Sequence, residues 1–319
     1  MDIQIIRTRA LGYGNSAQRC ADTIYCDHNL FMPAFSKKEG VGAVMRTTSQ
    51  RVSASIIGLI LMVASLVFLV PFAMIILNSL KDIGGSYSFD FSLPERLMFS
   101  NYTTVLQSAN IGRSMINGVI YSAFTSITVV ILSSMGSFVL SRNKTRANSI
   151  LYYVFIMGLV IPFMIVPTIR IMQLFNVYGS YLGLILIYAA TNVPFAVFLY
   201  TGYIKTINRD IDEAAVIDGC NAFNMFFRII FPLLTPVTIT LVLLMTIGIW
   251  NEFQMQIFFV ADSQKWGVAL TIYNFFAQYH RQWNMVCANI VIISFPMVLL
   301  FLFFQKYIVS GMAAGAVKG

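Results

Sequence analysis

Charged residues are scarce in this sequence of 319 residues, since Lys, Arg, Asp and Glu make up 11% of it. Ordinary soluble domains contain about 25% of these residues, because a soluble protein must cover its surface with polar groups. Hydrophobic residues make up 58% of the chain and the mean hydropathy is +0.75. The composition therefore indicates an integral membrane protein, and it argues against a soluble enzyme, a DNA-binding domain and a disulfide-rich secreted module.

Cysteine and histidine are also rare, with four and two copies. Cys20 and Cys26 lie in a polar N-terminal stretch, Cys220 in a polar loop and Cys287 in an apolar stretch, so the spacing predicts no disulfide framework. Cys20, Cys26 and His28 supply only three ligands, at a spacing that matches no tight zinc motif. We therefore expect no metal site.

Six stretches without Asp, Glu, Lys or Arg are each at least 23 residues long. A membrane span needs about 20 apolar residues, and a charge at its centre costs about 2.5–3.5 kcal/mol. We therefore predict an all-α membrane protein with six transmembrane helices. The stretches are residues 52–80, 114–141, 147–169, 171–204, 229–251 and 282–305. A turn at residues 176–180, which includes Gly179, is expected between the third and fourth helices.

The net charge is +8, but the charged residues lie between the apolar stretches rather than along one face. This distribution argues against a nucleic-acid partner. With the N-terminus in the cytoplasm, fifteen Lys and Arg residues fall on the cytoplasmic side and six on the other. Lys and Arg are retained on the cytoplasmic side of membranes, so we expect both termini there.

The N-terminal residues 1–50 contain no apolar run long enough to span a membrane and no signal-peptide pattern. We predict that they form a disordered cytoplasmic tail. Met45 is closely followed by the first span, and it is the expected natural start of the protein. Residues 51–319 then form the transmembrane domain.

One polar loop, at about residues 204–232, is as long as a span and is amphipathic. Asp210 and Glu213 have the spacing of a capping box at a helix start, and Gly219 is well placed to end that helix. Asn221 is suited to cap a second short helix that runs to Pro232. The pattern predicts a helix, a tight glycine turn and a second helix.

Two readings of this loop are open on physical grounds. Ala214 and Ala215 are small, so a surface of another protein could approach them closely. Alternatively, the loop is a connector that lies on the membrane, with Phe223, Phe226 and Phe227 inserted at the interface.

The residue spacing of the loop resembles the EAA loop in permease subunits of bacterial binding-protein-dependent ABC importers. The matching residues are Glu213, Ala214, Ala215, Asp218, Gly219, Ile229 and Pro232. The chain departs from the usual pattern at Phe231, where Leu is common, and at Cys220, where Ala is common. Residues 250–253, with the sequence Trp-Asn-Glu-Phe, and the C-terminal Gly-Ala-Val-Lys-Gly resemble the smaller, six-helix permease of maltose-type sugar importers. The resemblance covers residues 51–319 and implies the MetI-like permease fold.

The resemblance implies a division of labour among several proteins in a bacterial plasma membrane. A second, larger permease subunit completes the pathway, a dimeric ATP-binding cassette ATPase binds below it, and an extracytoplasmic binding protein delivers a sugar. The chain has no G-x-x-x-x-G-K-[S/T] phosphate loop, so ATP and Mg belong to the partner ATPase and we expect no cofactor on this chain.

The resemblance also implies the contacts with the ATPase. The helix with Glu213, Ala214 and Ala215 would lie in a groove of the ATPase, where Glu213 pairs with a basic residue. Asp218 and Gly219 would order the turn. The C-terminal tail is a second candidate contact, or alternatively a frayed end. It consists of Gly315, Ala316, Val317, Lys318 and Gly319.

Polar residues in or near the spans are candidates for the substrate pathway, because such residues tend to face a bundle interior or a water path. They are Asn117, Asn192, Asn251, Glu252, Asn274 and Asn289. Each could equally form a hydrogen bond with a neighbouring helix. His28 and His280 are the only histidines, and no catalytic constellation emerges.

Three other functions remain open. The first is an ABC permease for amino acids, peptides or polyamines. The second is a secondary transporter, although such proteins place ionisable groups near the membrane midplane and the six apolar stretches have none. The third is a membrane scaffold without transport activity.

Overall fold

The computed structural model describes residues 48–108, 110–278 and 282–316, and those residues form helices, turns and loops without a β-strand. The expected start at Met45 and most of the predicted tail lie outside the described residues. The chain divides into two compact units, residues 1–63 and 64–319.

Helix α2 (Thr48–Ser79) contains the first predicted span. Its stretch Ile57–Ser79 is long and apolar enough to cross a membrane. Large apolar side chains such as Leu61 and Phe68 are exposed along most of this stretch. Water would make such a surface unfavourable, whereas lipid would not, so α2 has the surface of a membrane helix.

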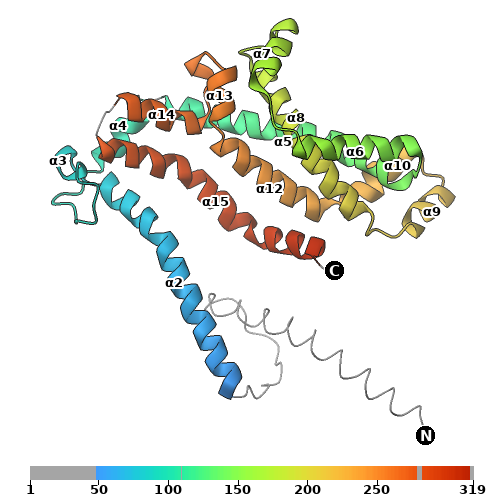
Figure 1. The fold of residues 1–319 in the computed structure, drawn as a ribbon, viewed down its shortest axis with the longest axis horizontal. Coiled ribbons are helices and arrows are strands. Elements are labelled where there is room, and N and C mark those ends of the chain that lie inside the picture. Colours follow the sequence, from blue (N-terminus) through green and yellow to red (C-terminus); the bar gives the residue numbers. More distant parts are fainter. Residues whose placement is uncertain (1–47, 109, 279–281, 317–319) are drawn as a thin grey trace. The chain divides into compact units, whose positions relative to one another are not determined.

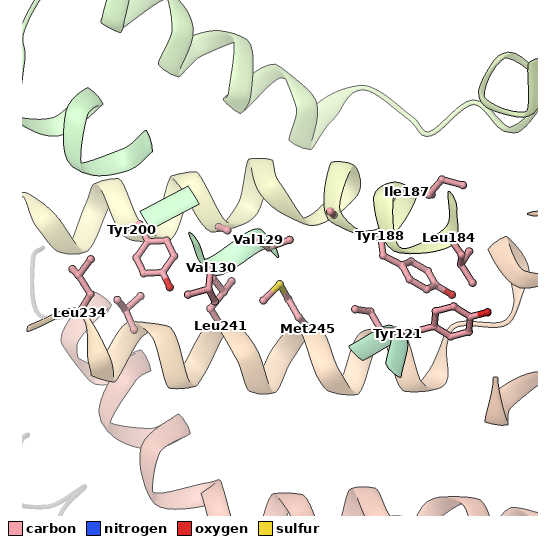
Figure 2. Packing of buried hydrophobic residues seen from close by; sticks show 14 of the residues in the cluster. Tyr121, Val129, Val130, Leu184, Ile187, Tyr188, Tyr200, Leu234, Leu241 and Met245 are labelled. Carbon is pink, nitrogen blue, oxygen red and sulfur yellow. The ribbon is translucent and has the colours of Figure 1, made fainter. Parts of the chain in front are cut away.

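Three helices pack together as the core of the second unit, namely α5 (Ile111–Arg142), α8 (Tyr181–Ile204) and α12 (Thr235–Asn251). The buried face of α5 carries small residues, including Ser126 and Ser133, which let the helices approach closely. Figure 2 shows apolar side chains that fill the space between them, with Tyr121 and Tyr188 towards one end of the core and Tyr200 towards the other.

The third predicted span is broken in the structure. Residues 147–169 were expected to form one helix, but α6 (Arg146–Val160) and α7 (Ile165–Leu174) are bent by 119° relative to each other. The reason lies in Pro162, because proline disfavours a helical conformation in the residue before it, and Ile161 is extended there with ψ of 122°. The predicted turn after α7 is confirmed, since Asn176 and Gly179 both have positive φ.

The fifth span also differs from the expected single helix over residues 229–251. A short π-helix η2 (Phe226–Ile230) and α11 (Phe231–Leu233) precede α12, and the chain bends by 73° there. Prolines at 232 and 236 lack the N–H that a continuous helix would use, which accounts for the irregular passage.

Short helices and a long C-terminal helix complete the chain (Figure 1). They are α3 (Ile83–Ser86), α4 (Ser100–Ser108), α9 (Asp210–Ile217), α10 (Ala222–Met225), α13 (Gln254–Phe259), the 3-10 helix η3 (Ser263–Lys265), α14 (Val268–Gln278) and α15 (Trp283–Ala316). Four described helices are long and apolar enough to cross a membrane, or six if each bent pair crosses once. The second count agrees with the six predicted spans.

Candidate functional site

The loop between α8 and η2 has the predicted form of helix, glycine turn and helix. Gly219 ends α9 with a φ of +78°, a left-handed conformation that glycine adopts without strain. The Gly219 N–H donates to the carbonyl of Val216 at 3.0 Å, and the Cys220 N–H to that of Ala215 at 2.9 Å. The Asn221 side chain accepts a hydrogen bond from the Asn224 N–H at 2.8 Å and so caps α10.

The start of α9 differs from the predicted capping box. The helix begins at Asp210, and the residue before it, Arg209, makes no side-chain cap. The Asp210 carboxylate instead accepts from the Asn208 side-chain amide at 2.7 Å. Asp210, Asp212 and Glu213 all lie in the first turn, where negative charge is stabilised by the helix dipole.

The predicted contact residues on α9 do not share one environment. Glu213, Ala214, Asp218 and Gly219 are exposed, whereas Ala215 is 3% exposed and packs within its own chain. Ala215 therefore packs inside this chain, and its predicted contact with the ATPase stays a prediction. Its small side chain serves packing inside the chain, and a partner can approach this helix at Ala214.

Exposed apolar side chains complete the outer surface of the loop. Ile217 is 86% exposed, and Val216 and Phe223 are exposed as well. Phe226, expected at a membrane interface, is instead buried, with its ring centroid 5.6 Å from that of Phe138 on α5. Sequence reasoning missed Val216 and Ile217, although their spacing from Glu213 along α9 was visible.

The start of α9 is fastened to the end of α5 by Arg142. Its guanidinium contacts both carboxylate oxygens of Asp212, with Nε 2.5 Å from Oδ2 and Nη2 3.3 Å from Oδ1. It also donates to the carbonyl of Ile207 at 3.3 Å. Sequence reasoning counted Arg142 only as a cytoplasmic charge, because nothing in the local sequence indicates a partner 70 residues away.

At the opposite end of the core, Asn117 is buried and fully engaged by its own chain. Its amide donates to the carbonyls of Gln264 and Trp266, both at 2.9 Å, and its oxygen accepts from the Tyr181 hydroxyl at 2.8 Å. The Tyr121 hydroxyl donates to the neighbouring carbonyl of Lys265 at 2.7 Å. Asn117 therefore holds η3 against α5 and α8 rather than facing an open path.

Glu252 is half-buried at the end of α12 and has two partners. One carboxylate oxygen accepts from the Tyr188 hydroxyl at 2.9 Å, and the other caps α13 by accepting from the Met255 N–H at 2.7 Å. Gln256 extends this network, since its side chain accepts from the Gly267 N–H at 2.6 Å. Glu252 thus joins α8, α12 and α13.

Three of the remaining candidates, Asn192, Asn251 and Asn289, also bond to their own chain. The Asn251 amide donates to the Ile247 carbonyl at 2.9 Å. Asn192 is half-buried and donates to the Tyr188 carbonyl at 2.8 Å. Asn289 is buried, with its amide 3.5 Å from the Thr271 hydroxyl. The side chain of Asn274 lies outside the described residues.

Asn251 is exposed, and it lines a pocket of about 480 Å³ between α12, α14 and α15. The pocket wall is mostly apolar and aromatic, with Trp250, Phe253, Val268, Ala269, Ile272, Tyr273, Phe276, Ile293 and Ser294. The Trp250 indole N–H donates to the Ile293 carbonyl at 3.1 Å. Trp250 also packs against Gly118 of α5, where a Cβ would lie only 3.1 Å from the ring.

The proposed C-terminal contact is described only in part. Gly315 and Ala316 end α15, and Val317, Lys318 and Gly319 lie outside the described residues. Among the described residues, no group of three or more His, Cys, Asp and Glu side chains is placed to hold a metal ion.

The long apolar helices, whose ends are joined by hydrogen bonds between polar side chains and the backbone, are those of a multi-pass α-helical membrane protein. A family model described as the binding-protein-dependent transport system inner membrane component matches residues 133–314, which include this loop. The chain belongs to that family.

Two relatives are similar over most of their length. The melibiose/raffinose/stachyose import permease protein MelC of Bacillus subtilis is 33% identical over 277 residues, which cover 86% of this chain and 99% of MelC. The diacetylchitobiose uptake system permease protein NgcG of Streptomyces coelicolor is 30% identical over 275 residues, 85% of this chain and 91% of NgcG.

The fold is also similar to that of a solved structure. A chain from the crystal structure of a bacterial ABC transporter involved in import of the acidic polysaccharide alginate superposes with a TM-score of 0.71 and 22% identity. The match covers 83% of this chain and 99% of that one. This likeness concerns the fold.

Proposed function

We propose that this chain is the transmembrane permease subunit of an ATP-driven importer and forms half of the pathway for a carbohydrate. The observation that carries the proposal is the exposed α9–α10 loop inside the region of the family match, residues 133–314. The names of MelC and NgcG, both uptake permeases for oligosaccharides, support a carbohydrate as the cargo.

In this proposal α9 lies in a groove of a partner ATPase. Glu213 pairs with a basic residue of the partner, and Ala214 permits the close approach. The exposed Ile217 adds an apolar contact at the same surface. ATP and Mg bind to the ATPase and not to this chain, and the tail Gly315, Ala316, Val317, Lys318 and Gly319 makes a second contact with it.

The same proposal sets the orientation in a bacterial plasma membrane. The α9 loop and both termini face the cytoplasm, which agrees with the excess of Lys and Arg there. The α13–α14 segment then faces outwards, towards an extracytoplasmic binding protein. A second, larger permease subunit covers the other side of the pathway.

The pocket beside Asn251 is the proposed point of contact with the carbohydrate in this chain. Aromatic rings of Trp250, Phe253 and Tyr273 offer flat apolar faces, and the Asn251 amide offers a polar group. Binding sites for small molecules combine such apolar walls with a few polar groups. Asn117 has three hydrogen-bond partners in its own chain, so its role here is to hold helices together.

The test is affinity purification of this chain from native membranes in mild detergent, followed by mass spectrometry and uptake assays in proteoliposomes. We expect a second permease, an ATPase and a binding protein to co-purify, and uptake of an oligosaccharide to require ATP.

Two results would change this conclusion. Recovery of this chain alone, in detergents that keep known ABC complexes intact, would favour a secondary transporter. An intact complex that imports amino acids, peptides or polyamines but no sugar would retain the importer class and overturn the carbohydrate.

A further inference from the structure

Three contacts join the end of α5 to the start of α9. The Arg142 guanidinium holds the Asp212 carboxylate and the Ile207 carbonyl, at the distances given above. In return, the Arg209 guanidinium donates to the Arg142 carbonyl at 3.4 Å. The contacts run in both directions, so each of the two segments is bound by a side chain of the other.

The position of this cluster strengthens it. The Arg142 and Asp212 side chains are only 12% and 16% exposed, so solvent screens their attraction less than at an open surface. The last carbonyls of α5 form the negative end of a helix dipole and the first N–H groups of α9 form a positive end. Arg142 and Arg209 lie at the negative end, and Asp212 lies at the positive end.

Helix α5 connects this cluster to the pocket. It has 32 residues and therefore spans about 48 Å, at a rise of about 1.5 Å per residue. Near its other end, Gly118 packs against Trp250 of the pocket wall, and Asn117 holds the η3 backbone. A displacement of α9 would therefore reach α5 at Arg142, and α5 is one continuous helix that contacts the pocket wall near its other end.

We propose that the Arg142–Asp212 ion pair is the joint that transmits movement of the coupling helix α9 to α5 and through it to the pocket. The inference rests on the proposed function, and it makes Arg142 and Asp212 positioning residues for transport. Chains of packed elements with rigid helices are the physical carriers of such coupling. A loose joint would let α9 follow the ATPase while α5 stayed in place.

The experiment compares two neutralised carboxylates in the same helical turn of the purified complex. Asp212→Asn removes the partner of Arg142, and Asp210→Asn is the matched control, because Asp210 is exposed and bonds to Asn208. For Asp212→Asn we expect transport per ATP hydrolysed to fall at least about tenfold, equivalent to about 1.4 kcal/mol of coupling. ATPase co-purification and ATP hydrolysis should stay near wild type, and Asp210→Asn should change none of these quantities.

A charge swap tests whether the pair itself matters. Arg142→Asp and Asp212→Arg alone should each uncouple transport, and the double variant should recover at least part of the transport per ATP, as a double-mutant cycle of interacting residues requires. Normal transport per ATP in Asp212→Asn would overturn the joint. So would a double variant that accumulates in the membrane like wild type and does no better than the single variants.

The two proposals can fail separately. If the wild-type complex shows no ATP-dependent carbohydrate uptake, the proposed function fails. If wild type transports and Asp212→Asn transports equally well per ATP, only the joint fails.

Discussion

The two ends of the α5–α8–α12 core differ in how they use polar side chains. At the α13 end, Asn117, Tyr121, Tyr188, Glu252 and Gln256 bond to groups of the same chain. Their partners are mostly on α13, η3 or the backbone next to them. At this end of the core, the polar side chains therefore hold segments of the chain to one another.

At the α9 end, one half-buried ion pair holds the helix, and other acidic side chains are exposed. Arg142 holds Asp212, while Glu213 and Asp218 are exposed beside the exposed Ile217. The exposed Ile217 beside a carboxylate is the surface that the proposed contact with a partner protein would cover. The difference teaches that buried polar groups stabilise the chain itself, and that exposed ones of the same type are available to partners.

The largest effect is expected from Glu213→Lys at the open surface. Reversing a charge that pairs across an interface costs about 2–5 kcal/mol, so transport should fall at least about 30-fold. The protein should remain in the membrane, because Glu213 is exposed in this chain. Uptake by proteoliposomes, normalised to the amount of permease, is the measurement.

Asp210→Lys is the matched control for that variant, since it reverses a charge in the same turn of α9. It should retain most of the transport activity. Full uptake by well-expressed Glu213→Lys would contradict the coupling role of Glu213.

The next effect compares two asparagines at the α13 end. Asn117→Leu leaves two backbone carbonyls and a tyrosine hydroxyl without their partner, at about 1–3 kcal/mol for each unpaired buried group. The free energy of unfolding in detergent should fall accordingly. Asn251→Leu should change it by no more than about 0.5 kcal/mol, as is usual for exposed positions.

Transport kinetics complete this test. Asn251→Leu should raise the KM for the carbohydrate without loss of stability. If the two variants were equally stable, the claim that the hydrogen bonds of Asn117 stabilise the fold, whereas Asn251 in the pocket wall does not, would be wrong.

A smaller effect is expected at the glycine turn of the α9 loop. Gly219 has a φ of +78°, which costs a residue with a side chain about 1–2 kcal/mol. Gly219→Ala should therefore loosen the turn and reduce co-purification of the ATPase. Gly202→Ala in α8 is the control, because a Cβ there meets open space and alanine favours the helix. Equal ATPase recovery in both variants would show that the turn geometry does not matter.

The smallest effect concerns the ion pair of Lys81 and Asp90 in the segment between α2 and α5. The Lys81 side chain is 1% exposed, and its ammonium lies 2.6 Å from an Asp90 oxygen. This contact holds the pKa of Asp90 well below its usual range. A lowered pKa in the folded state adds stability that is present above about pH 4 and is lost as the pH falls below it.

Asp90→Asn should consequently lower the Tm at pH 7, and the difference from wild type should shrink as the pH drops below about 4. Glu95→Gln, an exposed carboxylate in the same segment, is the control and should leave the Tm unchanged. A pH-independent difference in Tm would show that the charge of Asp90 is not the cause.

Sequence patterns anticipated the helices well where the cause is local. Gly219 and Asn221 punctuate the α9 loop as expected, because turn and cap preferences depend on the residue and its immediate neighbours. The capping box at Asp210 was predicted wrongly, since the chain before α9 is held by Arg142 and the helix starts one residue away from the expected cap.

The candidate site shows the limit of such patterns. From the sequence, an asparagine in a membrane helix could either face the substrate pathway or form a hydrogen bond with a neighbouring segment. The two backbone carbonyls that bind Asn117 belong to residues about 150 positions further along the chain. The same ambiguity applied to Ala215, whose burial depends on what α9 packs against. Sequence spacing carries no information about either neighbour.

By itself, the sequence determined the membrane class, the number of apolar stretches and the helix–turn–helix form of the α9 loop, because hydropathy and turn chemistry act over a few residues. Tertiary structure alone decided which polar side chains form bonds within the chain and which remain exposed. It placed Asp212 against Arg142, Asn117 against η3 and Asn251 in the pocket wall. These outcomes depend on desolvation and hydrogen bonding between distant segments, and those energies exist only once the helices are packed.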